Sequence, residues 1–130
     1  MLKLLSSFKE KKHSNKRIKS GDQAEHFAAV FLERSGLRVI GRNFHSRYGE
    51  IDIICMEGDV VVFVEVKFRK NHSRGKAIES ITPSKLNKIL LTAQFWIKKH
   101  KHEHSPIRFD AVTFDQTIDE NSLNWFKAII

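Results

Sequence analysis

Apolar residues recur at helical spacing in two segments of the chain. The first stripe predicts a helix that begins near residues 20–22 and stops at Gly36, a residue type that often follows a helix end. The second predicts a helix that starts at Thr82-Pro83, with Thr as the cap and Pro in the first turn, and ends near His100. The stripes comprise Ala24, Phe27, Ala28, Phe31 and Leu32, and then Leu86, Ile89, Leu90, Ala93, Trp96 and Ile97.

The segments between and after these helices have strand patterns, either alternating or continuously apolar over a short length. The order helix, three strands, helix, two strands predicts an α/β fold with a mixed five-stranded sheet flanked by helices. The second helix would be the crossover between the third and fourth strands. The predicted strands are residues 37–40, 50–56, 60–69, 107–114 and 123–130, with a polar connection over residues 43–49.

Charged residues interrupt two of these strands. Asp52 lies among the isoleucines of Glu50-Ile51-Asp52-Ile53-Ile54, and Glu65 and Lys67 follow the apolar run 60–64. A buried charge without a partner costs several kcal/mol, so we expect these three side chains to act together. A divalent metal ion is the simplest partner for the two acids.

The turn between the two strands decides which side chains oppose each other. A two-residue turn at residues 58–59 places Asp52 opposite Glu65, whereas a turn at residues 57–58 places Glu50 opposite Glu65. Both keep the acids and the lysine on one face, and only a slip by one residue would separate them. We therefore expect one acidic cluster in either register.

This cluster has the chemistry of a site for hydrolysing phosphodiesters. Mg²⁺ or Mn²⁺ would bind Asp52 and Glu65, with the carbonyl of Val66 as a third oxygen ligand. Lys67 would hold the attacking water or neutralise developing charge. The other interpretation is an exposed, salt-bridged sheet face, because a second Glu-x-Lys element occurs at residues 10–12, where no site is expected.

The length and the charge distribution of the chain predict how it divides into domains and what kind of partner it binds. A chain of 130 residues is expected to form one domain, here residues 20–130. Residues 1–19 contain seven Lys or Arg and one Glu, so they hold +6 of the net charge of +8. Such a basic arm is typical of phosphate contact with a nucleic acid, and equally of a solubilising terminus.

The chain lacks an apolar run near the ~20 residues that span a bilayer, so we expect no membrane association and a cytoplasmic location. Cys55 is the only cysteine, which excludes an intrachain disulfide and agrees with a reducing compartment. It alternates with Ile51 and Ile53, and we expect it to be a small core residue.

Several short motifs, in this order and spacing, resemble the YraN-type family of predicted endonucleases. That family is similar to Holliday-junction resolvases of the PD-(D/E)XK nuclease superfamily. The resemblance implies a restriction-endonuclease-like sheet and Mg²⁺-dependent cleavage of DNA, and the resolvases suggest a homodimer. The motifs are Gly21-Asp22-Gln23-Ala24-Glu25, Asn43, Gly49-Glu50-Ile51-Asp52-Ile53-Ile54, Phe63-Val64-Glu65-Val66-Lys67-Phe68-Arg69, Gly75, Thr82 with Lys85, and Arg108-Phe109-Asp110.

Position by position, the resemblance implies that Asp52 and Glu65 are metal ligands and that Lys67 is the catalytic lysine. Glu25 would reach the site from the first helix, and Glu50 would be an accessory acid. The superfamily's proline before the first acid is absent, since Ile51 stands there.

Other charged residues have two interpretations each. Arg69, Arg74 and Lys85 would contact phosphate or remain solvated at the surface. We expect Arg108 and Asp110, on one strand face, to pair with each other. The histidines of residues 100–104 are expected to form a solvated tail to the helix rather than a metal site.

The sequence thus favours a metal-dependent endonuclease-like protein that hydrolyses DNA, with branched or structured DNA as one candidate substrate. The alternative is a non-catalytic nucleic-acid-binding module that retains a nuclease fold.

Overall fold

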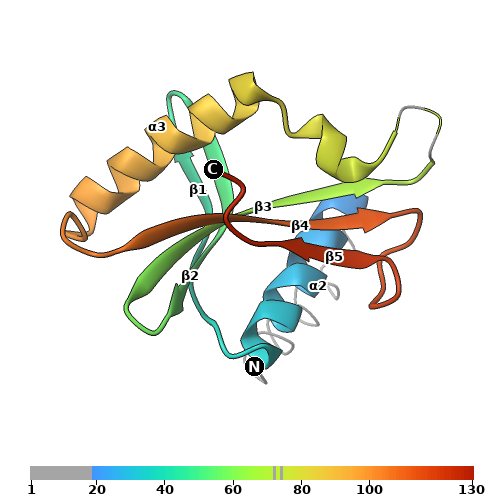
Figure 1. The fold of residues 1–130 in the computed structure, drawn as a ribbon, viewed down its shortest axis with the longest axis horizontal. Coiled ribbons are helices and arrows are strands. Elements are labelled where there is room, and N and C mark those ends of the chain that lie inside the picture. Colours follow the sequence, from blue (N-terminus) through green and yellow to red (C-terminus); the bar gives the residue numbers. More distant parts are fainter. Residues whose placement is uncertain (1–18, 72, 74) are drawn as a thin grey trace.

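A computed structural model describes residues 19–71, 73 and 75–130. The predicted basic arm, apart from Lys19, lies outside the described residues, and so does Arg74. The five strands form one mixed sheet in the order β1-β2-β3-β4-β5, and the predicted α/β fold is confirmed (Figure 1). The elements are α2 (Ser20–Arg34), β1 (Arg38–Ser46), β2 (Gly49–Glu57), β3 (Val60–Arg69), the 3₁₀ helix η1 (Ala77–Ser80), α3 (Pro83–Lys99), β4 (Ile107–Asp115) and β5 (Leu123–Phe126).

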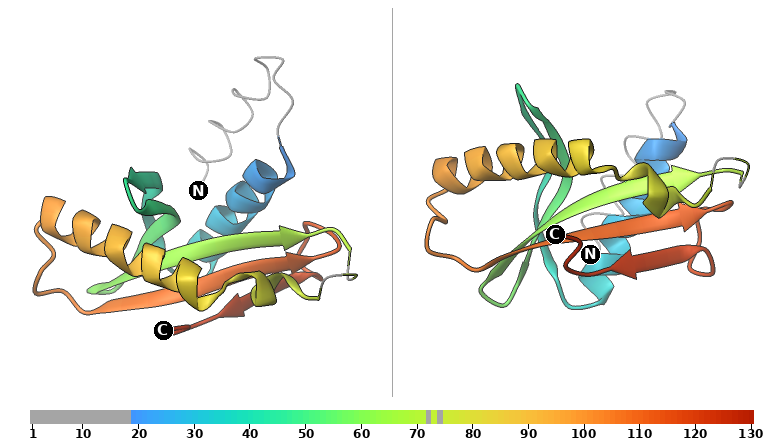
Figure 2. Two further views of the ribbon diagram at one scale, coloured as in Figure 1. Left: turned by 90° about the horizontal axis from the view of Figure 1, so that it is seen from above. Right: turned by 45° about the horizontal axis from the view of Figure 1, so that its top comes forward.

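The two long helices cover opposite faces of the sheet, as Figure 2 shows. Alternate residues of β3 enter two separate cores, since successive side chains of a strand point to opposite faces. Val62 and Val64 pack with Leu32 of α2, whereas Phe63 packs with Trp96 of α3. Cys55 is fully buried on the α2 side, as predicted for a core residue.

The predicted start and end of α3 are confirmed. The Thr82 hydroxyl accepts a hydrogen bond from the Lys85 N–H (3.2 Å), and Pro83 occupies the first turn. The following histidines are not a simple solvated tail, because the rings of His100 and His102 stack on Trp96, with centroids 4.3 and 5.2 Å away. Neither helix in the described part of the chain is long and apolar enough to cross a membrane.

The strand pairings settle the register left open by the sequence. Glu57 pairs with Val60 and Ile53 pairs with Val64, so the turn lies at residues 58–59 and the alternative at 57–58 is wrong. Gly58 has a φ of +60°, which glycine adopts at little cost. β3 and β4 are parallel, and α3 joins them as the predicted crossover.

Two predicted strand lengths are wrong. β1 continues through the predicted polar connection to Ser46, because as an edge strand it hydrogen-bonds to β2 on one side only and tolerates polar residues. β5 ends at Phe126 instead of reaching residue 130. Ala128 has a φ of +56°, and the Ile129 N–H turns back to donate to the Phe109 carbonyl.

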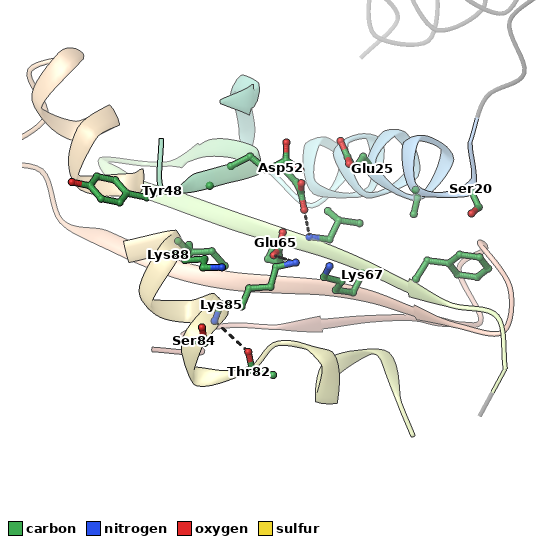
Figure 3. A pocket seen from close by; sticks show the side chains of 17 residues that line it. Ser20, Glu25, Tyr48, Asp52, Glu65, Lys67, Thr82, Ser84, Lys85 and Lys88 are labelled. Atoms are coloured by element: carbon green, nitrogen blue, oxygen red, sulfur yellow. Dashed lines mark hydrogen bonds and ion pairs between the residues drawn. The ribbon is translucent and has the colours of Figure 1, made fainter. Parts of the chain in front are cut away.

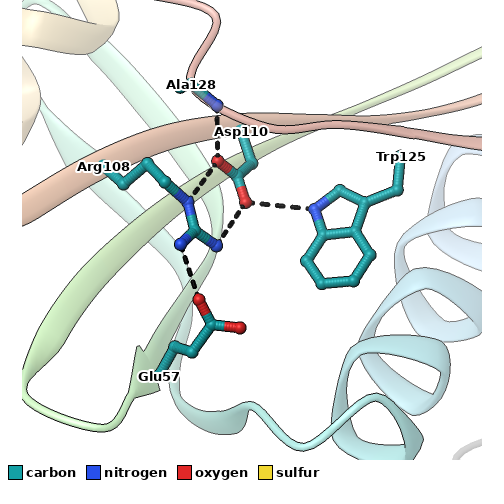
Figure 4. Close-up of polar contacts among 5 residues, drawn as sticks. All are labelled: Glu57, Arg108, Asp110, Trp125 and Ala128. Atoms are coloured by element: carbon teal, nitrogen blue, oxygen red, sulfur yellow. Dashed lines mark hydrogen bonds and ion pairs between the residues drawn. The ribbon is translucent and has the colours of Figure 1, made fainter.

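A polar network fastens this C-terminal segment to β4 (Figure 4). The buried Asp110 carboxylate accepts two hydrogen bonds from Arg108, at 2.9 and 3.0 Å. It also accepts from the Trp125 indole N–H and the Ala128 backbone N–H, both at 3.0 Å, while Arg108 pairs with Glu57. The predicted pairing of Arg108 with Asp110 is confirmed, and its setting is structural.

We predict that Asp110→Ala lowers the free energy of unfolding by about 3 kcal/mol, because it leaves the Arg108 charge without its buried partner. Urea denaturation followed by circular dichroism measures the loss. Glu120→Ala, on an exposed acid, is the control and should stay within about 0.5 kcal/mol of the parent. Equal stability of the two variants would show that the network is dispensable.

Candidate active site

The candidate site lies where the ladder between β2 and β3 ends. The last paired residues are Ile53 and Val64, and beyond them the Asp52 Oδ2 accepts a hydrogen bond from the Val66 N–H at 2.8 Å. A side-chain carboxylate thus replaces a backbone carbonyl as the acceptor for β3. The gap belongs to a cavity of about 610 Å³ that extends between α2 and the start of α3 (Figure 3).

The alternation of faces along β2 breaks at Asp52. Ile51 packs in the core on the α3 side, yet Ile53 packs on the α2 side, although strict alternation would put both on one face. The prediction that the acids and Lys67 share one face of a regular sheet is therefore only partly correct. The alternation is interrupted at Asp52, whose side chain hydrogen-bonds to the β3 backbone. Asp52 and Glu65 nevertheless line the same cavity.

The two acids form a buried, mutually repelling pair. Asp52 and Glu65 are each only 5% exposed. Burial, a hydrogen bond with Glu65 and repulsion by its charge together raise the pKa of Asp52 to about 9, and the Val66 N–H opposes the shift. The Glu65 Oε2 is buried and makes no hydrogen bond, and the Lys85 Nζ lies 3.2 Å away as an ion pair.

Two lysines face this pair from β3 and α3. Burial lowers the pKa of Lys67, and the adjacent Lys85 lowers it further. Burial also lowers the pKa of Lys85, but its hydrogen bond with Lys67 and the Glu65 carboxylate outweigh burial and leave it raised. Lys85 is therefore the firmly charged member of the pair, and Lys67 gives up its proton more readily.

The accessory acids also line the cavity. Glu25 is half-buried on α2, and Figure 3 shows it on the opposite side of β3 from Lys85. Burial raises the pKa of Glu25; Arg42 lowers it, whereas other acids, including Glu50 and Glu65, raise it. Glu50 is exposed, and its carboxylate lies 3.4 Å from His45.

The residues expected to contact phosphate have different surroundings. Lys85 lies in the cavity beside Glu65. Arg69 is half-buried and donates to the Gly75 carbonyl at 3.4 Å, so it helps to hold the loop after β3 and does not line the cavity. The prediction for Arg74 lies outside the described residues.

The cavity contains residues that the sequence analysis missed. Lys88 follows Lys85 by three positions on α3, a spacing that puts both on one helix face and was available as a signal. Tyr48 comes from the β1–β2 turn, and no sequence pattern connected it to the acids. The other hydroxyl-bearing residues that were missed as cavity residues are Ser20, Thr82 and Ser84.

The acid pair fits a hard divalent cation that keeps part of its water shell. Among residues 19–71, 73 and 75–130, no group of three or more His, Cys, Asp or Glu side chains is arranged to hold a metal. Mg²⁺ commonly binds through one or two carboxylates, and Asp52 and Glu65 supply that number. A cation would also relieve the repulsion between them and engage the Glu65 oxygen that lacks a hydrogen bond.

We predict that Asp52→Asn stabilises the metal-free protein at pH 8. The carboxyl titrates near 4 in the unfolded chain and near 9 in the folded one, so the folded chain holds the proton more tightly between these values. Its contribution to stability is complete below about pH 4 and is lost as the pH rises towards 9. Asparagine is neutral and can still accept from the Val66 N–H.

Urea denaturation in EDTA measures this effect. The variant should gain at least about 1 kcal/mol at pH 8 and nothing near pH 4, since a tenfold change in proton affinity is worth about 1.4 kcal/mol. Glu103→Gln, which removes one exposed charge beyond α3, is the control and should show no such pH dependence. A gain that is the same at both pH values would contradict the assignment to Asp52.

Comparison with known proteins places this arrangement in a family. The profile of the uncharacterised protein family UPF0102 matches residues 24–114, which contain both acids and both lysines. A UPF0102 protein of Marinomonas sp. (strain MWYL1) is 43% identical over 125 residues, covering 96% of this chain and 97% of the relative. One from Vibrio vulnificus (strain YJ016) is 42% identical over 112 residues, with 85% and 90% covered. The family membership predicted from the motifs is confirmed, and the chain belongs to UPF0102.

Proposed function

We propose that the protein is a metal-dependent endonuclease that hydrolyses phosphodiester bonds of DNA. The observation that carries this proposal is the buried pair Asp52 and Glu65, on adjacent strands, with Lys67 and Lys85 beside it in one open cavity. Two adjacent buried carboxyl groups ionise together only with enough positive charge beside them. A divalent cation would add such charge, and two carboxylates are a common ligand set for it.

Asp52 and Glu65 would hold Mg²⁺ or Mn²⁺, with the Val66 carbonyl as a further candidate ligand. When bound, such an ion polarises the phosphoryl oxygens and lowers the pKa of bound water. The Asp52 carboxylate is already oriented by the Val66 N–H, so its position does not depend on the ion.

The lysines would act on the reacting phosphate. In hydrolysis the water loses a proton as its oxygen forms a bond to phosphorus, the bond to one sugar oxygen breaks, and that oxygen takes up a proton. Lys67 has a lowered pKa and suits the orientation of the attacking water. Lys85 keeps its charge and offsets the negative charge that develops on the phosphoryl oxygens.

Lys85 also accounts for the site's stability without metal. Its ammonium lies 3.2 Å from the Glu65 carboxylate and supplies the positive charge that the acid pair requires. Glu25 and Glu50, which line the same cavity, are proposed as accessory acids.

DNA, branched or otherwise structured, is the proposed substrate, and a homodimer and a cytoplasmic location stay predictions. The alternative is a binding module without chemistry. The positive charge of residues 1–19 favours this alternative. Of these residues, only Lys19 belongs to the described part of the chain. Salt-sensitive DNA binding without cleavage, weakened by removal of the arm and unchanged by Asp52→Asn, would favour the module.

We predict that Mg²⁺ or Mn²⁺ raises the melting temperature of the parent protein but not that of Asp52→Asn. A ligand that binds only the folded state at a hundred times its Kd stabilises by about 2.7 kcal/mol. Differential scanning fluorimetry over a titration, starting from EDTA, measures the shift. Glu103→Gln should respond like the parent. An equal shift in Asp52→Asn would mean that the ion binds elsewhere.

We predict that the parent cleaves at least one DNA in a panel of flaps, four-way junctions and single strands when Mg²⁺ or Mn²⁺ is present. Glu65→Gln and Lys67→Ala should each reduce the rate at least about 100-fold, since one loses a metal ligand and the other the water-orienting group. Gel assays measure the rates, circular dichroism checks folding, and Glu103→Gln is the control. Equal cleavage by the parent and Glu65→Gln would refute the proposal.

A further inference from the structure

A second hollow, of about 540 Å³, adjoins the candidate active site. Tyr48 lines both cavities, so the two are neighbours that share this residue as a wall. Figure 3 shows Tyr48 at one end of the active-site cavity, beside α3. The other residues lining the hollow all come from α3 and are Leu91, Gln94, Phe95, Lys98 and Lys99.

Phe95 is not required by the core. The α3 residues that face the sheet are Ile89, Thr92, Ala93 and Trp96, whereas Phe95 lies outside this stripe and is 50% exposed. Single exposed aromatic residues are common on protein surfaces, so the significance of Phe95 depends on what lies around it.

The aromatic pair is open rather than closed on itself. The ring centroids of Tyr48 and Phe95 are 6.3 Å apart and the rings are inclined by 53°, so they do not cover each other as stacked rings would. The Tyr48 hydroxyl accepts a hydrogen bond from Arg47 at 2.9 Å, and the same guanidinium lies 5.0 Å from the tyrosine ring centroid. Tyr48 is thus in contact with Arg47, while Phe95 is half exposed to solvent.

Positive charge surrounds this pair. Lys98 and Lys99 line the hollow, and among the described residues that line it none is acidic. Arg47 lies on the Tyr48 side, and Lys88 continues the basic residues along α3 into the active-site cavity. A stacking surface flanked by cations matches a single nucleic-acid strand, whose bases stack on aromatic rings and whose phosphates follow a basic groove.

We propose that the Tyr48–Phe95 hollow binds an unpaired base of single-stranded DNA, with Arg47, Lys98 and Lys99 contacting the flanking phosphates. This proposal extends the proposed function. It rests on that function in one respect, namely that the bound strand continues into the active-site cavity. The substrate is then DNA with a single-stranded segment at the cleavage site. Recognition by stacking is tolerant of sequence, because every base has a flat aromatic face.

The test measures binding without cleavage. Fluorescence anisotropy in EDTA compares a labelled 12-nucleotide oligo(dT) with a blunt duplex of the same length, for the full chain. The parent should prefer the single strand. Phe95→Leu, which keeps an apolar side chain but removes the aromatic ring, should weaken single-strand binding by about five- to a hundredfold and leave duplex binding unchanged.

A matched control is Phe126→Leu, because Phe126 is an exposed aromatic residue on β5 that lines neither cavity. It should bind the single strand like the parent. Single-strand binding by Phe95→Leu at parental strength, or a parent that binds both DNAs equally, would overturn the proposal. So would light scattering showing a dimer that Phe95→Ala converts to monomer, since the hollow would then join two copies of the chain.

The outcome is separable from that of the proposed function. Single-strand preference lost in Phe95→Leu, in a parent that cleaves no DNA with Mg²⁺, would support the hollow and refute the nuclease. Cleavage abolished by Glu65→Gln, together with unaltered binding in Phe95→Leu, would do the reverse.

Discussion

The site depends on one hydrogen bond. At the point where β2 and β3 stop pairing, the Val66 N–H donates to the Asp52 carboxylate instead of to a backbone carbonyl. Strands that part in this way would normally leave an unsatisfied donor, which a buried structure does not tolerate. The carboxylate satisfies the donor and is itself held rigidly beside Glu65. Separation of the strands, orientation of the acid and opening of the cavity therefore share one cause.

The same arrangement places electrostatic strain in the middle of the fold. Burial and repulsion raise the pKa of Asp52, and Glu65 forms an ion pair with Lys85. Cost of this kind is common where function is selected over stability. The contrast with Asp110 is instructive. That acid is equally buried, but it receives four hydrogen bonds and serves to anchor the C-terminal segment.

The position of α3 connects the chemistry to the surface where a substrate would arrive. Its first turn carries Lys85 to the acid pair, and its outer side carries Phe95 and Lys98 past Tyr48. The buried face of α3 packs against the sheet and fixes the rotation of the helix about its axis. Lys85 and Phe95 therefore keep fixed positions relative to each other.

The sequence by itself determined the order of elements and the identity of the acids. Periodicity predicted both helices, the Gly58-Asp59 turn was one of two possible registers, and charges inside apolar strands selected Asp52, Glu65 and Lys67. Such features are local, since they depend on residues close together in the chain.

Only the tertiary structure decided how far β1 extends, because its polar residues join the sheet solely by pairing with β2. It also decided that the alternation along β2 breaks at Asp52, that Lys85 pairs with Glu65, and that Tyr48 meets Phe95. These contacts join segments distant in sequence. Their geometry follows from how the helices and strands pack against each other, a relation that no local pattern contains.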